Sequence, residues 1–220
     1  MLTLEEIFPP FGLRLRTPRL ELRILQDGDL PELMVAVDAG IHEPGQSPFS
    51  VPWSEAPAEE LPANMARFHW GTRSGFTPEK WELAFGVWFE GALIGSQSLT
   101  AHDFAKRRAV ESGSWLRKDF QGWGIGKEMR AAILLYAFDF LGASMAESSA
   151  MTWNRRSLGV SYALGYLDNG LRREYDSQGG ATEVQHLRLD AQNLLRPAWT
   201  LDVAGHEAFA RFVGLTPPAK

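Results

Sequence analysis

Three glycines alternate with larger residues in the segment Gln121-Gly122-Trp123-Gly124-Ile125-Gly126-Lys127. The segment follows a predicted strand at residues 109–116 and opens a predicted helix at residues 124–141. Glycine allows left-handed backbone angles and lets a ligand approach the backbone closely. The first turn of a helix also has free N–H groups and a partial positive charge. The sequence therefore predicts a binding site for an anion, typically a phosphate, between this strand and this helix.

Two common phosphate-binding motifs do not fit this segment. A P-loop requires glycine where Gln121 stands, and it requires serine or threonine after the lysine, where this chain has Glu128. A Rossmann fingerprint requires one more residue between its second and third glycines. It also belongs to a parallel sheet, whereas the strands before this segment are predicted to form an antiparallel meander.

Periodic patterns predict the other elements. Leu20, Leu22 and Ile24 alternate with charged residues, which indicates a half-buried strand. Asp27 and Pro31 mark the start of a helix that is predicted to run to about residue 37. Further strands are predicted at residues 82–89, 93–100, 109–116, 144–151, 166–175 and 182–189, with a Gln178-Gly179-Gly180 turn joining the last two. Further helices are predicted at residues 61–73, 124–141, 154–164 and 205–212.

This order predicts an α/β (α+β) fold in which a mixed, mostly antiparallel central sheet of about seven strands has helices on both faces. We expect one domain at residues 1–190, with residues 191–220 as a C-terminal extension packed on it or trailing it. Residues 40–60 are rich in Pro, Gly and Ser and also contain Phe49 and Trp53. Loops of this length are often functional, so we expect this loop to bind or pack, with a disordered connector as the alternative.

Composition narrows the class of protein. The formal net charge is −5 and the chain has no long basic run, so we expect no nucleic-acid partner. The chain has no cysteine, which excludes disulfides, thiolate nucleophiles and cysteine metal sites. The first ten residues do not resemble a signal peptide, and the longest apolar stretch, at residues 131–137, is too short to cross a membrane. We therefore expect no membrane partner and a cytoplasmic location.

The glycine segment and its flanks resemble a known enzyme family. Residues 121–126 match the pattern Q/R-x-x-G-x-G/A of the GCN5-related N-acetyltransferase (GNAT) superfamily. Four further motifs, in the family's order, resemble its RimJ/RimL-like branch: Thr17-Pro18-Arg19-Leu20, Ser114-Trp115-Leu116, Asn154-Arg155-Arg156-Ser157 and Leu164-Gly165-Tyr166. Residues 48–53, 112–116 and 128–132 are also similar to an actinobacterial GNAT group that includes a mycobacterial N-succinyltransferase.

The resemblance implies the GNAT fold and an acyl-CoA-dependent N-acyltransferase. Its co-substrate would be acetyl-CoA or succinyl-CoA, its acceptor an amine, and no metal would be needed. A homodimer is also an expectation from the family. In the family, the central strand splays from its neighbour and coenzyme A enters the gap. The residues expected to bind the coenzyme are Trp115, Leu116, Arg117, Gln121, Gly122, Trp123, Gly124, Ile125, Gly126, Lys127, Asn154 and Ser157.

Attack of a neutral amine on a thioester needs a base and donors for the oxyanion and the departing thiolate. The resemblance implies Glu111 as the base, acting directly or through water, because it stands on the central strand where relatives carry an acidic residue. It shares a strand face with Gly113 and Trp115. The backbone N–H of Leu116 is predicted to stabilise the oxyanion, and Ser157 to donate to the thiolate. Each of the two side chains could instead be an ordinary surface group.

The family often has a tyrosine as the thiolate's proton donor, one helical turn after Ser157. This chain has Ser161 at that position, with Tyr162 beside it, so the donor stays open between Ser157, Ser161 and no dedicated acid. Phe49, Trp53 and Trp88 are predicted to contact the acceptor, although Trp88 could also be a core residue. A non-catalytic acyl-CoA-binding module on the same fold remains an alternative, since function depends on the site and not on the fold.

Overall fold

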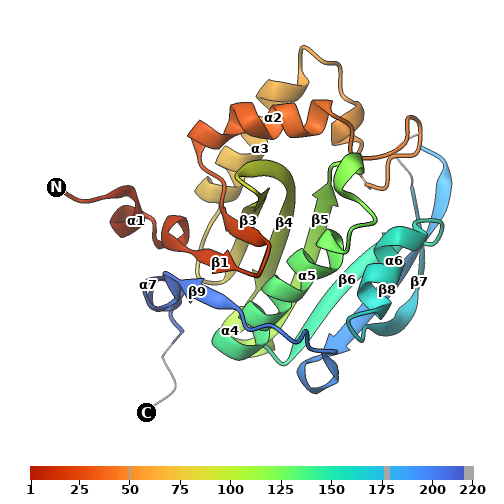
Figure 1. Cartoon of the computed structure of the whole chain (residues 1–220). Helices are drawn as coiled ribbons and strands as arrows, with labels where there is room; N and C mark the ends of the chain where they lie inside the picture. Colours follow the sequence, from red (N-terminus) through yellow and green to blue (C-terminus); the bar gives the residue numbers. More distant parts are fainter. Residues whose placement is uncertain (50, 176–178, 216–220) are drawn as a thin grey trace.

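The computed structural model describes residues 1–49, 51–175 and 179–215. Their strands form one sheet in the order β7-β8-β6-β5-β4-β3-β2-β1-β9 (Figure 1). The strands are β1 (Arg14–Arg16), β2 (Leu20–Ile24), β3 (Lys80–Phe89), β4 (Ala92–His102), β5 (Ala109–Leu116), β6 (Met145–Met151), β7 (Leu167–Tyr175), β8 (Ala181–Asp190) and β9 (Asp202–Ala204). Neighbouring strands are antiparallel except β5 and β6, which are parallel.

The predicted fold class is therefore confirmed, but the described sheet has nine strands, not about seven. The two additional strands are β1 and β9, which pair with each other at one edge of the sheet. Each has only three residues, which is too short for an alternating pattern to stand out in the sequence. All the predicted strands are present. In the turn that was predicted between the last two strands, Gln178 lies outside the described residues.

The helices are α1 (Leu4–Ile7), α2 (Leu30–Asp38), α3 (Leu61–Ser74), α4 (Phe104–Arg107), α5 (Ile125–Leu135), α6 (Arg155–Tyr162) and α7 (His206–Phe212). All the predicted helices are confirmed, and α5 continues through the π-helical turn η5 (Tyr136–Phe140). The sequence did not reveal the four-residue helices α1 and α4. Gly165, just beyond α6, has a φ of +99°, and a Cβ there would lie 2.4 Å from the carbonyl oxygen of Asn193, so only glycine fits.

Two hydrophobic clusters lie on opposite faces of the sheet. The larger cluster joins one face of the strands to α5 and includes Phe85, Leu116 and Met129. The smaller cluster lies under α2 and α3 and includes Trp88. Helices on both faces were predicted and are visible in Figure 1, where α5 and α6 lie in front of the sheet and α2 and α3 lie above and behind it. The two faces of β5 are therefore different: Leu116 faces α5, and Trp115 faces the α2–α3 side.

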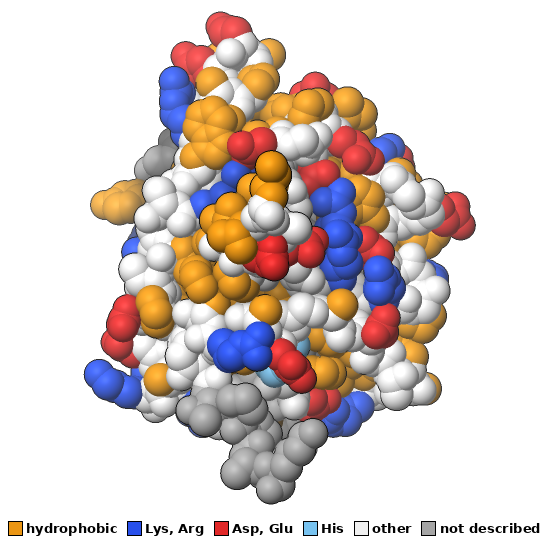
Figure 2. Space-filling model, turned by 90° about the vertical axis from the view of Figure 1, so that its left-hand side faces the viewer, with side chains coloured by type: hydrophobic (Ala, Val, Ile, Leu, Met, Phe, Trp, Pro, Cys, Tyr) orange, Lys and Arg blue, Asp and Glu red, His pale blue; other side chains and the backbone are white. Residues whose placement is uncertain are grey.

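Residues 191–215 add to the larger cluster, since Leu194, Phe209 and Val213 are buried in it. The division into residues 1–190 and a C-terminal extension stays a prediction, and residues 216–220 lie outside the described part. Helix α1 has no buried residue and projects from the body in Figure 1. Figure 2 shows that side of the molecule, with acidic, basic and hydrophobic groups interspersed. No helix in the described part of the chain is long and apolar enough to span a membrane.

Candidate active site

Strands β5 and β6 diverge after their first three residues. Their last paired residues are Glu111 and Glu147. Beyond this pair, β5 remains paired with β4 as far as Leu116, and β6 remains paired with β8 as far as Met151. The splay expected from the family resemblance is therefore present, and we call the opening between these halves the β5–β6 gap.

The backbone N–H and C=O groups of every second residue of β5 point into this gap. The N–H of Arg117 donates to the carbonyl of Ile94 on the β4 side (2.9 Å). Because successive residues of a strand point their N–H groups to opposite neighbours, the N–H of Leu116 faces the gap. The Ser148 hydroxyl of β6 reaches the carbonyl of Ser112 (3.5 Å), so the backbone polar groups of even-numbered residues of β5 point toward β6. The geometry thus leaves a backbone donor where the oxyanion donor was predicted.

The glycine segment, which we call the phosphate loop (residues 121–126), connects the end of β5 to the start of α5. Gly122 and Gly124 have φ values of +83° and +78°, in the left-handed region. Gly124 is the residue that precedes the helix, and no side chain caps the free N–H groups of the first turn. Ile125 is buried in the larger hydrophobic cluster and anchors the helix start. The arrangement offers open backbone donors at the positive end of a helix of eleven residues, which suits a phosphate.

An ion pair between the exposed Arg19 and the buried Glu128 fixes the far side of this loop. Glu128, in the first turn of α5, accepts from the guanidinium of Arg19 (2.6 Å) and from the hydroxyl of Thr17 (2.5 Å). Arg19 also donates to the carbonyl of Trp123 (3.1 Å), so that carbonyl points away from an incoming anion. These contacts explain part of the Thr-Pro-Arg-Leu motif, because Thr17 and Arg19 hold the loop and the helix together.

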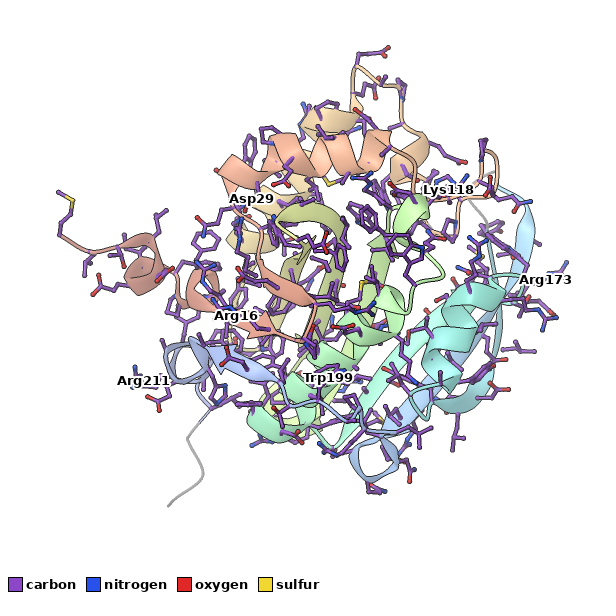
Figure 3. All side chains as sticks on the ribbon, viewed as in Figure 1. Arg16, Asp29, Lys118, Arg173, Trp199 and Arg211 are labelled. Carbon is purple, nitrogen blue, oxygen red and sulfur yellow. The ribbon has the colours of Figure 1, made fainter. Side chains whose placement is uncertain are left out.

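The charged residues near the loop differ in their availability. Arg117 is paired with Asp119 (2.6 Å), and Lys118 is paired with Glu43 (2.8 Å). Lys118 is labelled in Figure 3, near the upper end of β5. Lys127 is exposed and makes no ion pair with any described residue, so it is available to a phosphate, as are the exposed Arg155 and Arg156 at the start of α6. Trp123 is also largely exposed, at 60%, and contacts Phe120.

Helix α6 begins on the other side of the phosphate loop. The Asn154 side chain accepts from the N–H of Ser157 (3.1 Å) and caps the helix. The Ser157 hydroxyl makes no hydrogen bond to any described residue. Ser161 is buried and donates to the carbonyl of Ser157, and the Tyr162 hydroxyl donates to Asp168 on β7. Of the three, Ser157 is therefore the one whose hydroxyl is uncommitted, and its role as proton donor stays a prediction.

Carboxylates line the face of the sheet opposite α5. The cross-strand register places Glu82, Thr100, Glu111 and Glu147 in one row across four strands. Glu111 is exposed, and so is Gly113, two residues on along the same face, where an added Cβ would lie 3.2 Å from the Ser98 hydroxyl. Burial raises the pKa of Glu82, and the charge of Glu111 adds to the rise. Only Glu111 and Glu147 are direct neighbours in this row, and Glu147 is paired with Arg107 (3.9 Å), which offsets their repulsion.

The loop at residues 40–60, which we call the acceptor loop, folds back onto β5. Phe49 lies 5.0 Å from Trp53, and Trp53 lies 6.1 Å from Trp115, between ring centroids. Phe49 and Trp53 are thus brought to the same strand face as Glu111, as the predicted acceptor role requires. Trp88 is buried in the smaller cluster, with the Arg23 guanidinium 3.8 Å from its ring. It therefore packs in the core beneath the acceptor loop. Its direct contact with an acceptor stays a prediction.

Two features of the site were not foreseen from the sequence. Arg130 of α5 is 3% exposed and bridges the gap, donating to Ser114 of β5 and Ser148 of β6, both at 3.1 Å. It is the only charged residue among the ten at 129–138, so its unusual environment could have been predicted from the sequence. The second feature is a set of contacts made by the Gln121 side chain, which joins residues up to 80 positions apart and has no sequence signal.

Comparison with known proteins agrees with this geometry. An acetyltransferase (GNAT) domain model matches residues 19–167. The chain is 31% identical over 114 residues to YdaF of Bacillus subtilis (strain 168), whose name places it provisionally among ribosomal N-acetyltransferases. The matched part is 52% of this chain and 60% of YdaF, so the chain spans less than two thirds of that relative.

Two solved structures share the fold. RimJ of Mycobacterium smegmatis, solved in complex with a coenzyme A disulfide, has a TM-score of 0.71 at 17% identity, over 92% of this chain and 94% of RimJ. RimL, a ribosomal α-N-protein acetyltransferase solved with coenzyme A, has a TM-score of 0.65 at 19% identity, over 79% of this chain and 95% of RimL. At these identities the similarity concerns the fold alone.

Proposed function

The chain belongs to the GNAT acetyltransferase family, and on this premise we propose that it transfers an acetyl group from acetyl-CoA to a primary amine. The observation that carries the proposal is the β5–β6 gap, which ends at the phosphate loop and has the Leu116 N–H facing into it. A thioester carrier with a diphosphate would have its phosphates at the phosphate loop and its thioester carbonyl at the Leu116 N–H. The names of YdaF and RimL make the α-amine of a ribosomal protein the first acceptor to test.

Each predicted catalytic group has a separate task in this proposal. Glu111 accepts the proton of the attacking amine through a chain of water molecules, because the five residue steps along the strand from it to Leu116 span about 16 Å. The Leu116 N–H donates to the carbonyl oxygen as negative charge develops on it. The Ser157 hydroxyl, at the start of α6, donates to the departing sulfur, assisted by the positive end of that helix. Gly122, Gly124, Gly126 and Lys127 bind the diphosphate, and Phe49 and Trp53 border the acceptor.

Calorimetry followed by a turnover assay tests the proposal. We expect the protein to bind coenzyme A and not ATP or NAD, and to release free thiol from acetyl-CoA with at least one amine of a panel that includes ribosomal-protein N-terminal peptides. Binding without thiol release on any amine would favour the non-catalytic acyl-CoA-binding module. Binding of a nucleotide in place of coenzyme A would refute the proposal.

Succinyl-CoA is a second candidate donor, and Arg130 is the observation that favours it. This buried guanidinium has no carboxylate partner among the described residues, although buried charges are normally paired. Its Nε, the Ser112 hydroxyl and the Tyr166 hydroxyl are buried and lie against one another, without a hydrogen bond of good geometry among the described residues. The cluster is rich in donors and lies at the gap, so it could bind the distal carboxylate of a succinyl group.

Replacing Arg130 by methionine is expected to separate the two donors. If the guanidinium binds a distal carboxylate, kcat/KM with succinyl-CoA should fall by about 10- to 100-fold more than kcat/KM with acetyl-CoA, which corresponds to one lost charged hydrogen-bond pair. Arg130→Lys, which keeps the charge, should retain part of the succinyl preference. Equal losses with both donors would instead mean that Arg130 only holds the two strands.

The remaining expectations from the sequence stay proposals: a homodimer, a cytoplasmic location and the absence of a nucleic-acid partner. Among the described residues, no group of three or more His, Asp or Glu side chains could hold a metal ion. The proposed chemistry uses none.

A further inference from the structure

The side-chain amide of Gln121 contacts three segments at once. Its Nε2 donates to the carbonyl of Leu116 (2.8 Å) and to the carbonyl of Ile41 (3.1 Å). Its Oε1 accepts from the guanidinium of Arg156 (2.9 Å). Both N–H groups of the amide are thus used by carbonyls and its oxygen by a cation, which fixes the orientation of the amide.

These three segments carry the parts of the proposed site. Leu116 supplies the backbone donor at the end of β5, Ile41 begins the acceptor loop, and Arg156 lies in the first turn of α6 beside Ser157. The Gln121 backbone opens the phosphate loop. One side chain therefore connects the proposed coenzyme site, the thioester donor strand and the loop beside the acceptor.

Other contacts tie the acceptor loop to the same place. The Lys118 N–H donates to the carbonyl of Gly40 (3.0 Å), and the Lys118 ammonium pairs with Glu43. The tip of the loop is held by ring contact between Trp53 and Trp115, and His42 is hydrogen bonded to Ser54 (2.8 Å). The last residues of β5 and the segment after them, residues 115–121, therefore contact the acceptor loop at both its base and its tip.

We propose that Gln121 is a positioning residue, which couples coenzyme binding at the phosphate loop to the placement of the acceptor loop. This inference rests on the proposed function. The Gln121 side chain is fully engaged by the protein, so it does not itself contact a phosphate. An anion bound by the backbone of residues 122–126 fixes the backbone of residue 121, and its side chain then fixes Ile41. Binding of the acyl donor consequently fixes the position of the acceptor loop.

The test is hydrogen exchange of backbone amides combined with steady-state kinetics, in the wild type and in Gln121→Glu. The substitution keeps the size of the side chain but removes both N–H donors from the carbonyls of Leu116 and Ile41. We expect coenzyme A to slow exchange at residues 122–126 in both proteins, and to slow exchange at residues 41–49 and 51–55 only in the wild type. The acceptor KM should rise about tenfold, in keeping with loss of the hydrogen bond to Ile41 of the acceptor loop, while the Kd for coenzyme A stays within threefold.

The exposed Gln192 gives a matched control, and Gln192→Glu should behave as the wild type in both measurements. Gln121→Met, which cannot donate, should reproduce the kinetic effect without introducing a charge. The inference is wrong if Gln121→Glu weakens coenzyme A with no change in the acceptor KM, or if coenzyme A never protects the acceptor loop in the wild type while it protects residues 122–126. If coenzyme A protects neither region, the proposed function fails and this inference fails with it.

Discussion

Replacing Glu111 by glutamine is expected to lower kcat/KM for acyl transfer by about 100-fold or more, the usual contribution of a general base. The reason is that Glu111 is the exposed carboxylate on the strand whose backbone enters the β5–β6 gap. The Kd for coenzyme A should not change, because the phosphate loop lies at the other end of the gap. Calorimetry and a thiol-release assay measure the two quantities separately.

Glu82→Gln is the matched control, since Glu82 lies in the same row two strands away. We expect it to reduce kcat/KM by less than tenfold. If Glu82→Gln removes activity and Glu111→Gln does not, the base has been assigned to the wrong carboxylate. If neither variant affects a turnover that the wild type clearly shows, the acidic row is not part of the chemistry.

The pH dependence of stability separates lost catalysis from lost folding. Burial and the Glu111 charge raise the pKa of Glu82, so the folded state binds its proton more tightly than the unfolded state. The contribution of Glu82 to stability is therefore fully present below the ordinary glutamate pKa of about 4.3 and is lost as the pH rises through its raised pKa. Glu111→Gln removes one cause of the raised pKa of Glu82. The melting temperature of the variant minus that of the wild type should therefore be larger at pH 7 than at pH 4.

Much of the framework of the site could be predicted from the sequence because it rests on local patterns. The β3–β5 meander consists of strands separated by short connections, α5 has a long apolar face, and left-handed glycines mark the phosphate loop. The position of Glu111 relative to Gly113 and Trp115 followed from the period of a strand alone. The divergence of β5 from β6 came from the family resemblance and is confirmed by the pairing.

The parts that were missed depend on contacts between distant segments. The edge strand β9 exists because it pairs with β1, almost 190 residues earlier, and three residues carry no period of their own. The contacts of Gln121 with Ile41 and Arg156 likewise require the folded chain. Arg130 was a different case. A single arginine within an apolar helical run could have been predicted to be a buried charge, and buried charges are rare unless they have a partner.

Gly124→Val is expected to weaken coenzyme A binding by about 100-fold, the second large effect. Gly124 adopts a φ of +78° directly before α5, and a β-branched residue is a strong outlier there. Valine would have to leave this conformation, which would redirect the free N–H groups of the first helical turn. Gly124→Ala, with a cost of roughly 1–2 kcal/mol for a left-handed residue, should weaken binding by about tenfold. A Cβ at this position would meet only the Arg19 guanidinium, at 3.6 Å, so the fold should tolerate the change.

Gly126→Ala provides the contrast within the same loop. Gly126 lies in the first turn of α5 with ordinary helical angles, and an added Cβ would lie 3.7 Å from a methyl carbon of Val160 in α6, a normal contact. We expect the Kd for coenzyme A to stay within threefold, and the melting temperature to rise slightly, because alanine is a better helix former than glycine. Calorimetry on the three variants decides between two explanations of the glycines. Equal losses at Gly124 and Gly126 would mean that the ligand needs empty space along the whole loop, whereas normal binding by Gly124→Val would show that the diphosphate is held elsewhere.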